Sequence, residues 1–285
     1  MIILSEKVVK LGILKLGCIG SAPLLEFLLD ERAERNDIET RVIGTGASMK
    51  KKRCEDVAIS LLNYKPDLAI VISPNATVSG PTVAREVLLK NGIPTIIISD
   101  SPVKKILKDL EAAGYGYIIP EADSMIGARR EFLDPVEMAL FNTDVIKVLA
   151  VTGVFNLIVD SIDSVIQAIK EGEKPVLPKL VVKKEKALAA SGLQNPYARS
   201  KAMAAYEISN RVAGLTREGC FAIQEWESYT KVVAAAHEMM RVAARLTDEA
   251  REIEKSEDNV SRKPHAKDGI RLSKTKLMEK PVKLE

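Results

Sequence analysis

The first half of the chain alternates short apolar runs with amphipathic stretches. Residues 68–72 (LAIVI) and 95–98 (TIII) are continuous apolar runs, which are typical of strands covered on both faces. A turn and a stretch with helical spacing follow each run. This pattern predicts an α/β fold with a parallel, helix-covered, Rossmann-like sheet. The expected strands are residues 8–16, 38–44, 67–73, 93–99 and 115–119, and the expected helices follow Gly20 and span residues 53–63, 81–90 and 103–113.

From residue 135 the pattern becomes helical. Asp134 is a preferred helix cap, Pro135 suits the first turn, and Glu137 is placed to reach back to the cap. Apolar residues then cover most of the circumference, so we expect a mostly buried helix. Further helices are expected at residues 154–170, 196–213 and 228–255.

The connections suggest three parts. Residues 175–182 join two helices and offer one extra strand, and residues 219–223 form a short apolar piece. The basic, proline-bearing tail is expected to lie along a surface or a partner subunit. We therefore expect an α/β ligand-binding domain at 1–134, a helical bundle at 135–260 and an extended segment at 261–285.

Composition narrows the classes of partner. The net charge is +3 and only 4% of residues are aromatic, so we expect no nucleic-acid partner. Three cysteines and two histidines do not supply a usual zinc site, and we expect no metal. No apolar run approaches the roughly 20 residues that span a bilayer, so no membrane partner is expected either. A reduced, cytoplasmic protein fits this cysteine usage.

The expected ligand edge is where the strands end, because ligands of such sheets bind beyond the carboxyl ends of the strands. The turn at residues 17–20 (GCIG) has the spacing GxxG, which does not meet the dinucleotide fingerprint GxGxxG. Its glycines still suit the close approach of a ligand. The rule nominates residues 15–20, 44–48, 73–80 and 100–102, together with the charged segment around Arg129.

Long motifs, in order along nearly the whole chain, resemble one enzyme family. ADSMIGARREFLDPVEMALFN, NPYARSKAMAA, EGCF and AHEMMRVAARLTDEAREIEK are similar to the coenzyme F420-dependent methylenetetrahydromethanopterin dehydrogenases of archaea. The resemblance implies a cytoplasmic enzyme of one-carbon metabolism, in methanogenesis or its reverse. It further implies an α/β domain joined to a helix bundle, and a homohexamer built as a trimer of dimers. The implied reaction is reversible hydride transfer between methylenetetrahydromethanopterin and the 5-deazaflavin F420.

Three strand-end loops depart from the family pattern. Residues 15–20 read KLGCIG in place of a sequence like KCGNIG, residues 73–81 read SPNATVSGP in place of GPNPAAPGP, and residues 99–103 read SDSPV in place of GDAPG. These departures leave two alternatives. One is a related methylene-pterin dehydrogenase that uses NAD or NADP, and the other is a non-catalytic hexameric paralogue.

Hydride transfer between two rings requires placement and a suitable electric field, without a nucleophile or a metal. Oxidation gives the pterin a cationic ring, which a nearby carboxylate would stabilise. The candidates for this catalytic role are Asp100, Glu131 and Asp134, each of which could instead be structural.

Cofactor binding has its own candidates. The resemblance favours Arg129 and Arg130, because a guanidinium fork suits the acidic tails and the phosphodiester of F420, although both could form an ion-paired brace. His237 lies within a helix, where a bundle histidine is the more common role. The other cofactor-binding candidates are Lys15, Gly17, Gly20, Asn75 and Thr152.

Overall fold

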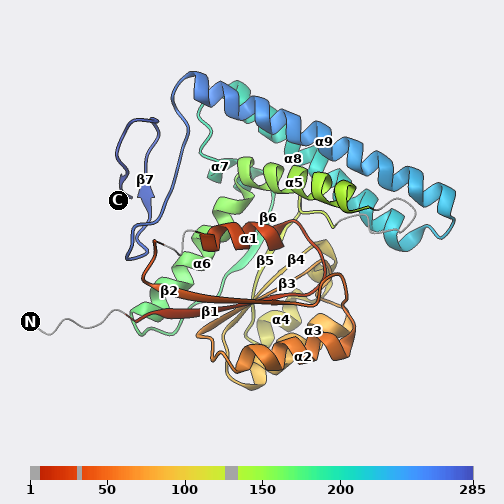
Figure 1. Cartoon of the computed structure of the whole chain (residues 1–285), viewed down its shortest axis with the longest axis vertical. Coiled ribbons are helices and arrows are strands. Elements are labelled where there is room, and N and C mark those ends of the chain that lie inside the picture. Colours follow the sequence, from red (N-terminus) through yellow and green to blue (C-terminus); the bar gives the residue numbers. More distant parts are fainter. Residues whose placement is uncertain (1–6, 31–33, 126–133, 285) are drawn as a thin grey trace, which may run out of the picture.

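The computed structural model describes residues 7–30, 34–125 and 134–284, and a six-stranded parallel sheet lies at its centre (Figure 1). The strand order is β2-β1-β3-β4-β5-β6. The expected parallel, helix-covered sheet is therefore confirmed. The strands are β1 (Val9–Lys15), β2 (Ile38–Gly44), β3 (Leu68–Ser73), β4 (Thr95–Ser99), β5 (Gly116–Pro120) and β6 (Lys179–Val182).

Helices cover both faces of this sheet (Figure 1). Alternate residues of a strand point to opposite faces, so Ile70 and Ile72 of β3 pack in one core while Ala69 and Val71 pack in another. The first core lies under α1 (Ser21–Asp30), α5 (Pro135–Val151) and α6 (Val154–Lys170). The opposite face carries α2 (Lys51–Leu62), α3 (Ser79–Lys90), the 3₁₀ helix η2 (Ser101–Ile106) and α4 (Leu107–Ala112).

The long helices α8 (Pro196–Arg217) and α9 (Trp226–Ser256) lie side by side above α5 (Figure 1). Buried alanines allow their close approach, among them Ala198 and Ala202 on α8 and Ala250 on α9. A π-helical segment, η3 (Glu218–Ala222), continues α8 where the sequence indicated only a short apolar piece. Such segments occur frequently at functional sites.

The start of α5 is partly as expected. The Asp134 carboxylate accepts hydrogen bonds from the Val136 and Glu137 amides at 2.7 and 3.0 Å. Glu137 does not reach back to the cap, because its Oε1 lies 2.8 Å from Nδ1 of His237 on α9. The expectation of a mostly buried helix was wrong, since Val136 is 67% and Leu140 48% exposed. The buried residues of α5 are Phe141, Val145, Val148 and Leu149.

The chain returns to the sheet after its first helical stretch. Residues 179–182 pair with β5 as the sixth strand, so the segment 175–182 does contain the extra strand that its sequence suggested. The short helix α7 (Lys184–Ala190) was not expected. The division at residue 134 remains a prediction, and both β6 and the sheet-covering α6 lie beyond it.

Helices α5 and α6 meet at a bend of 69°. Gly153 forms the bend with a φ of +89°, and a Cβ there would lie 2.1 Å from the Ala187 carbonyl oxygen, so the position requires glycine. Among the described helices, none alone has the length and apolar composition of a membrane span. The α5–α6 pair meets those two criteria only when its halves are joined across the bend.

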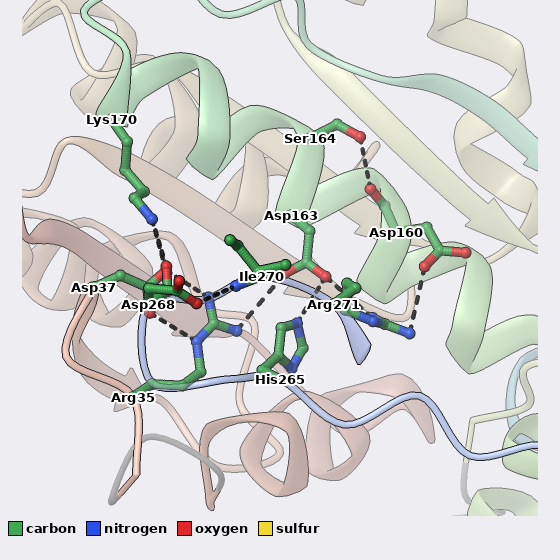
Figure 2. A network of polar contacts seen from close by, with 10 residues as sticks. All are labelled: Arg35, Asp37, Asp160, Asp163, Ser164, Lys170, His265, Asp268, Ile270 and Arg271. Atoms are coloured by element: carbon green, nitrogen blue, oxygen red, sulfur yellow. Dashed lines mark hydrogen bonds and ion pairs between the residues drawn. The ribbon is translucent and has the colours of Figure 1, made fainter. Parts of the chain in front are cut away.

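The carboxyl-terminal tail is held on its own chain by ion pairs (Figure 2). Asp163 of α6 lies 2.8 Å from Nε2 of His265 and 3.0 Å from the Arg271 guanidinium. Asp37, just before β2, forms a two-pronged pair with Arg35 at 2.9 Å. Burial alone would raise the pKa of Asp37, but Arg35 and Lys170 outweigh it and lower this pKa. The tail ends in a small hairpin of β7 (Leu272–Ser273) and β8 (Val282–Lys283).

Candidate active site

The loops that follow β1 and β3 meet at the carboxyl edge of the sheet. The strand order reverses direction between these neighbouring strands, and doubly wound sheets bind ligands at such a switch point. Gly17 has a φ of +93°, and a Cβ there would lie 2.9 Å from Pro74 and 3.2 Å from Met49. The first loop therefore packs directly behind the loop after β3.

A cleft of about 390 Å³ opens in front of these loops. Its floor comes from the α/β part and its far wall from the end of α8 and from η3. Polar and charged groups are set among apolar ones, as in many small-molecule sites. The lining residues are Met49, Pro74, Asn75, Asp100, Pro102, Lys105, Met125, Arg217 and Phe221.

Asp100 is the buried acid of this cleft. It follows β4, is 4% exposed and caps η2 by accepting a hydrogen bond from the Ser101 amide. Burial raises its pKa to about 6, although the hydrogen bonds from Ser101 and the charges of Arg217 and Lys104 act in the opposite direction. The protein therefore places a carboxylate of raised pKa beside a ligand-sized cavity, which is typical of functional sites.

The helical half contributes two residues that sequence reasoning missed. Arg217 ends α8 on the surface and lines both this cleft and an adjoining hollow of about 170 Å³. Phe221 of η3 is 57% exposed. The signal that could have found them is the EGCF motif, which begins directly after Arg217 and includes Phe221.

A second buried acid was also missed, behind the cleft. Asp123 follows β5 and is completely buried, and its carboxylate accepts hydrogen bonds from the Gly20 and Ser21 amides at 2.8 and 2.9 Å. Burial raises the pKa of Asp123 to about 7, and the nearby charge of Asp100 raises it further, against the effect of these hydrogen bonds. Asp123 belongs to the motif ADSM.

Three of the candidates from the sequence lie at the cleft. Asp100 and Asn75 line it, and Gly17 supports its wall. The Asn75 Oδ1 accepts hydrogen bonds from the amide and the hydroxyl of Thr77 at 3.0 and 2.6 Å. These bonds fix the side chain and leave its NH₂ group as the part that can meet a ligand.

Two further candidates have internal partners. Lys15 forms an ion pair with Glu26 at 2.9 Å, which braces the end of β1 against α1. The Gly20 amide is engaged by Asp123, and a Cβ at Gly20 would lie 2.3 Å from Val145, so the close approach there is to α5.

Two others lie away from the cleft. Thr152 is completely buried, and its hydroxyl donates to the Val148 carbonyl at 2.7 Å. His237 is 4% exposed and stacks on Phe141 with ring centroids 4.1 Å apart, as a bundle histidine does. Burial lowers the pKa of His237, although Glu137 acts against this.

Of the charged segment at residues 129–134, the structure describes only Asp134. Asp134 is the exposed cap of α5. Arg129, Arg130 and Glu131 lie outside the described residues, so their roles remain predictions. Met125, the last described residue before that segment, lines the cleft.

A separate hollow of about 380 Å³ lies near the amino ends of β4, β5 and β6, where Pro94, Tyr115 and Leu177 line it. It lacks the buried acid and the switch point, so we assign the site to the carboxyl edge. Within the described parts of the chain, no cluster of three or more His, Cys, Asp or Glu could hold a metal ion.

Comparison with known proteins agrees with this arrangement. A family model described as methylene-5,6,7,8-tetrahydromethanopterin dehydrogenase matches residues 9–282. The chain belongs to this family. A family member from Archaeoglobus fulgidus, named F420-dependent methylenetetrahydromethanopterin dehydrogenase, is 57% identical over 274 residues, which are 96% of this chain and 99% of the relative. One of the same name from Methanocaldococcus jannaschii is 52% identical over 275 residues, with the same coverage.

A solved structure of the dehydrogenase family is also similar to this chain. It is described as an F420-dependent methylene-tetrahydromethanopterin dehydrogenase in complex with methylene-tetrahydromethanopterin and coenzyme F420. The TM-score is 0.92 at 47% sequence identity, over 97% of this chain and 100% of that one. The resemblance noted from the motifs is thereby confirmed for the whole fold.

In this member of the dehydrogenase family, Asp100→Asn should change the pH dependence of stability. The folded-state pKa of about 6 lies above the ordinary value of 3.8, so ionisation of Asp100 opposes folding as the pH rises through this window. Asparagine still caps η2 but does not ionise. Between pH 4 and pH 8 the variant should gain up to about 3 kcal/mol in unfolding free energy relative to the parent. Urea denaturation at several pH values measures this.

The control is Asn75→Ala, which changes the same cleft without removing a titrating group. Its effect on the unfolding free energy should be equal at both pH values. If the two proteins differ in unfolding free energy by the same amount at every pH, folding does not raise the pKa of Asp100 and the prediction is wrong.

Proposed function

We propose that this chain catalyses reversible hydride transfer between methylenetetrahydromethanopterin and coenzyme F420. The observation that carries the proposal is the cleft at the switch point, where Asp100 of the α/β part faces a wall formed by Arg217 and Phe221. Support comes from the match along nearly the whole chain to a relative solved with both molecules. Bound there, the 5-deazaflavin ring of F420 supplies the hydride acceptor, and the protein supplies placement and electric field.

The residues of the cleft fit the chemical character of F420. Lys105 and Arg217 are exposed cations that can bind its phosphodiester and acidic tail. Pro74, Phe221 and the methionines offer flat or flexible apolar surface for ring systems. These surfaces can hold two rings in a fixed arrangement, which hydride transfer requires.

Asp100 is our candidate for stabilising the oxidised pterin. Loss of hydride leaves a cationic ring, and a pre-placed carboxylate lowers the energy of that charge. Asp100 has the required position and burial. Glu131 and Asp134 remain secondary candidates for this role, and Arg129 and Arg130 remain candidates for the anionic parts of F420.

The primary test is anaerobic spectrophotometry of the purified protein with methylenetetrahydromethanopterin plus F420, NAD or NADP. We expect loss of F420 absorbance and no nicotinamide reduction, because the chain lacks the dinucleotide fingerprint at residues 17–20. Nicotinamide reduction without F420 reduction would establish the alternative dehydrogenase. If calorimetry detects neither F420 nor pterin below the millimolar range, the chain is a non-catalytic paralogue.

Arg217→Ala tests the anion-binding role. The variant should raise the Michaelis constant for F420 at least tenfold, about 1.4 kcal/mol, while the melting temperature stays near that of the parent, since Arg217 is exposed. Arg199→Ala is the matched control, because Arg199 is exposed on the same helix and does not line the cleft. Equal kinetic constants for both variants would contradict the assignment of Arg217.

We also propose that the chain forms a homohexamer, a trimer of dimers, in the cytoplasm. Exposed apolar residues on α5 support a covered face there, since Val136 and Leu140 lie one turn apart. Light scattering should give six times 31.2 kDa, and Val136→Glu with Leu140→Glu should lower that mass. Ile59→Glu, an exposed position on α2 across the sheet, should leave it unchanged. A monomeric parent would contradict the assembly.

A further inference from the structure

Helix α1 begins where phosphate-bearing ligands bind in related sheets. In doubly wound sheets of this strand order, the helix after β1 starts at the switch point and presents free backbone amides. Its positive end then holds a phosphate of the ligand. Here α1 starts at Ser21, directly after Gly20.

In this chain, a side chain of the protein occupies that position. The Asp123 Oδ1 accepts the Gly20 amide proton at 2.8 Å, and its Oδ2 accepts the Ser21 amide proton at 2.9 Å. One anionic group on two successive amides is the contact that a phosphate would make. Because Asp123 is completely buried, no ligand can share these amides while it stays in place.

The surroundings of Asp123 are built to keep it there. A Cβ at Gly20 would lie 2.7 Å from the Asp123 Oδ1, so glycine is required for the carboxylate to come this close. The same Cβ would lie 2.3 Å from Val145, which fixes α1 against α5. Serine or asparagine could cap a helix without burying an acid, and burial opposes the charged form of Asp123. Capping alone therefore does not account for an aspartate here.

We propose that Asp123 is a specificity-determining residue that fills the phosphate position of α1 and so excludes the pyrophosphate of dinucleotide hydride carriers. Anionic groups of the cofactor must then bind across the cleft, beside Lys105 and Arg217. This inference deepens the proposed function and rests on it for the identity of the preferred carrier. The contact of Asp123 with the Gly20 and Ser21 amides does not depend on which hydride carrier the protein uses.

The test compares Asp123→Ser with the parent by isothermal titration of pyrophosphate and of NADP. The parent should bind each weakly, whereas the serine variant should bind each at least tenfold more tightly, because two amides become available and a negative charge is lost. Crystals of the variant soaked in pyrophosphate should place an anion on the Gly20 and Ser21 amides. Asp123→Asn, which keeps the volume but loses the charge, should show a smaller gain and serves if the serine variant does not fold.

Asp100→Asn is the matched control. It removes a buried charge from the same sheet edge and leaves Asp123 on α1, so it should not gain a ligand on the Gly20 and Ser21 amides. The proposal is overturned if a folded Asp123 variant gains no affinity, or if the soaked anion binds only beside Lys105 and Arg217. Lack of F420 reduction by the parent would contradict the proposed function alone, since the pyrophosphate result does not depend on turnover.

Discussion

The buried carboxylate of Asp123 joins parts of the chain that are about 100 residues apart. It connects the turn after β1 to the turn after β5, and Gly20 brings the same point within contact of Val145 on α5. The positive end of α1 compensates part of the cost of burying the acid. The turn after β1, the end of β5 and helix α5 are thus held in one arrangement, and the cleft forms in front of it.

The cleft depends on both halves of the protein. The sheet edge contributes Asn75 and Asp100 from rigid strand ends, whereas Arg217 and Phe221 come from the end of a long helix and its π-helical extension. Helix α8 packs along α9, and the Ser209 hydroxyl of α8 donates to the Ala122 carbonyl just after β5 at 2.6 Å, which holds the helix near the sheet edge. The proposed transfer between two bulky rings requires this kind of support, because a displacement of about 1 Å can lower the rate of a positioned reaction about 10²-fold.

Features that depend on neighbouring residues were predictable from the sequence, whereas features that depend on contacts between distant residues were not. Residues 68–72 indicated a buried strand because both faces of β3 are covered, and Asp134 indicated a helix start because its partners are the next residues. The burial of α5 was misjudged, because an apolar circumference does not say which neighbours exist, and Val136 remains exposed on the single chain. Asp123 was missed since its partners lie 102 and 103 positions away, which no spacing rule detects.

Charges are distributed differently at the two edges of the sheet. At the amino edge, next to β2, Asp37 is paired with Arg35 and Lys170, and these cations lower its pKa, so its charge is balanced where the tail docks (Figure 2). At the carboxyl edge, burial raises the pKa of Asp100 and Asp123. Hydrogen bonds from Ser101 and the charges of Arg217 and Lys104 oppose this at Asp100, and the Gly20 and Ser21 amides oppose it at Asp123. A carboxylate with an ion-pair partner stabilises the fold whether or not a ligand is bound. A buried carboxylate whose charged form is disfavoured is stabilised when a cationic ligand binds beside it. In the proposed reaction, the pterin becomes cationic on losing hydride, and this positive charge would lie beside the buried acid Asp100.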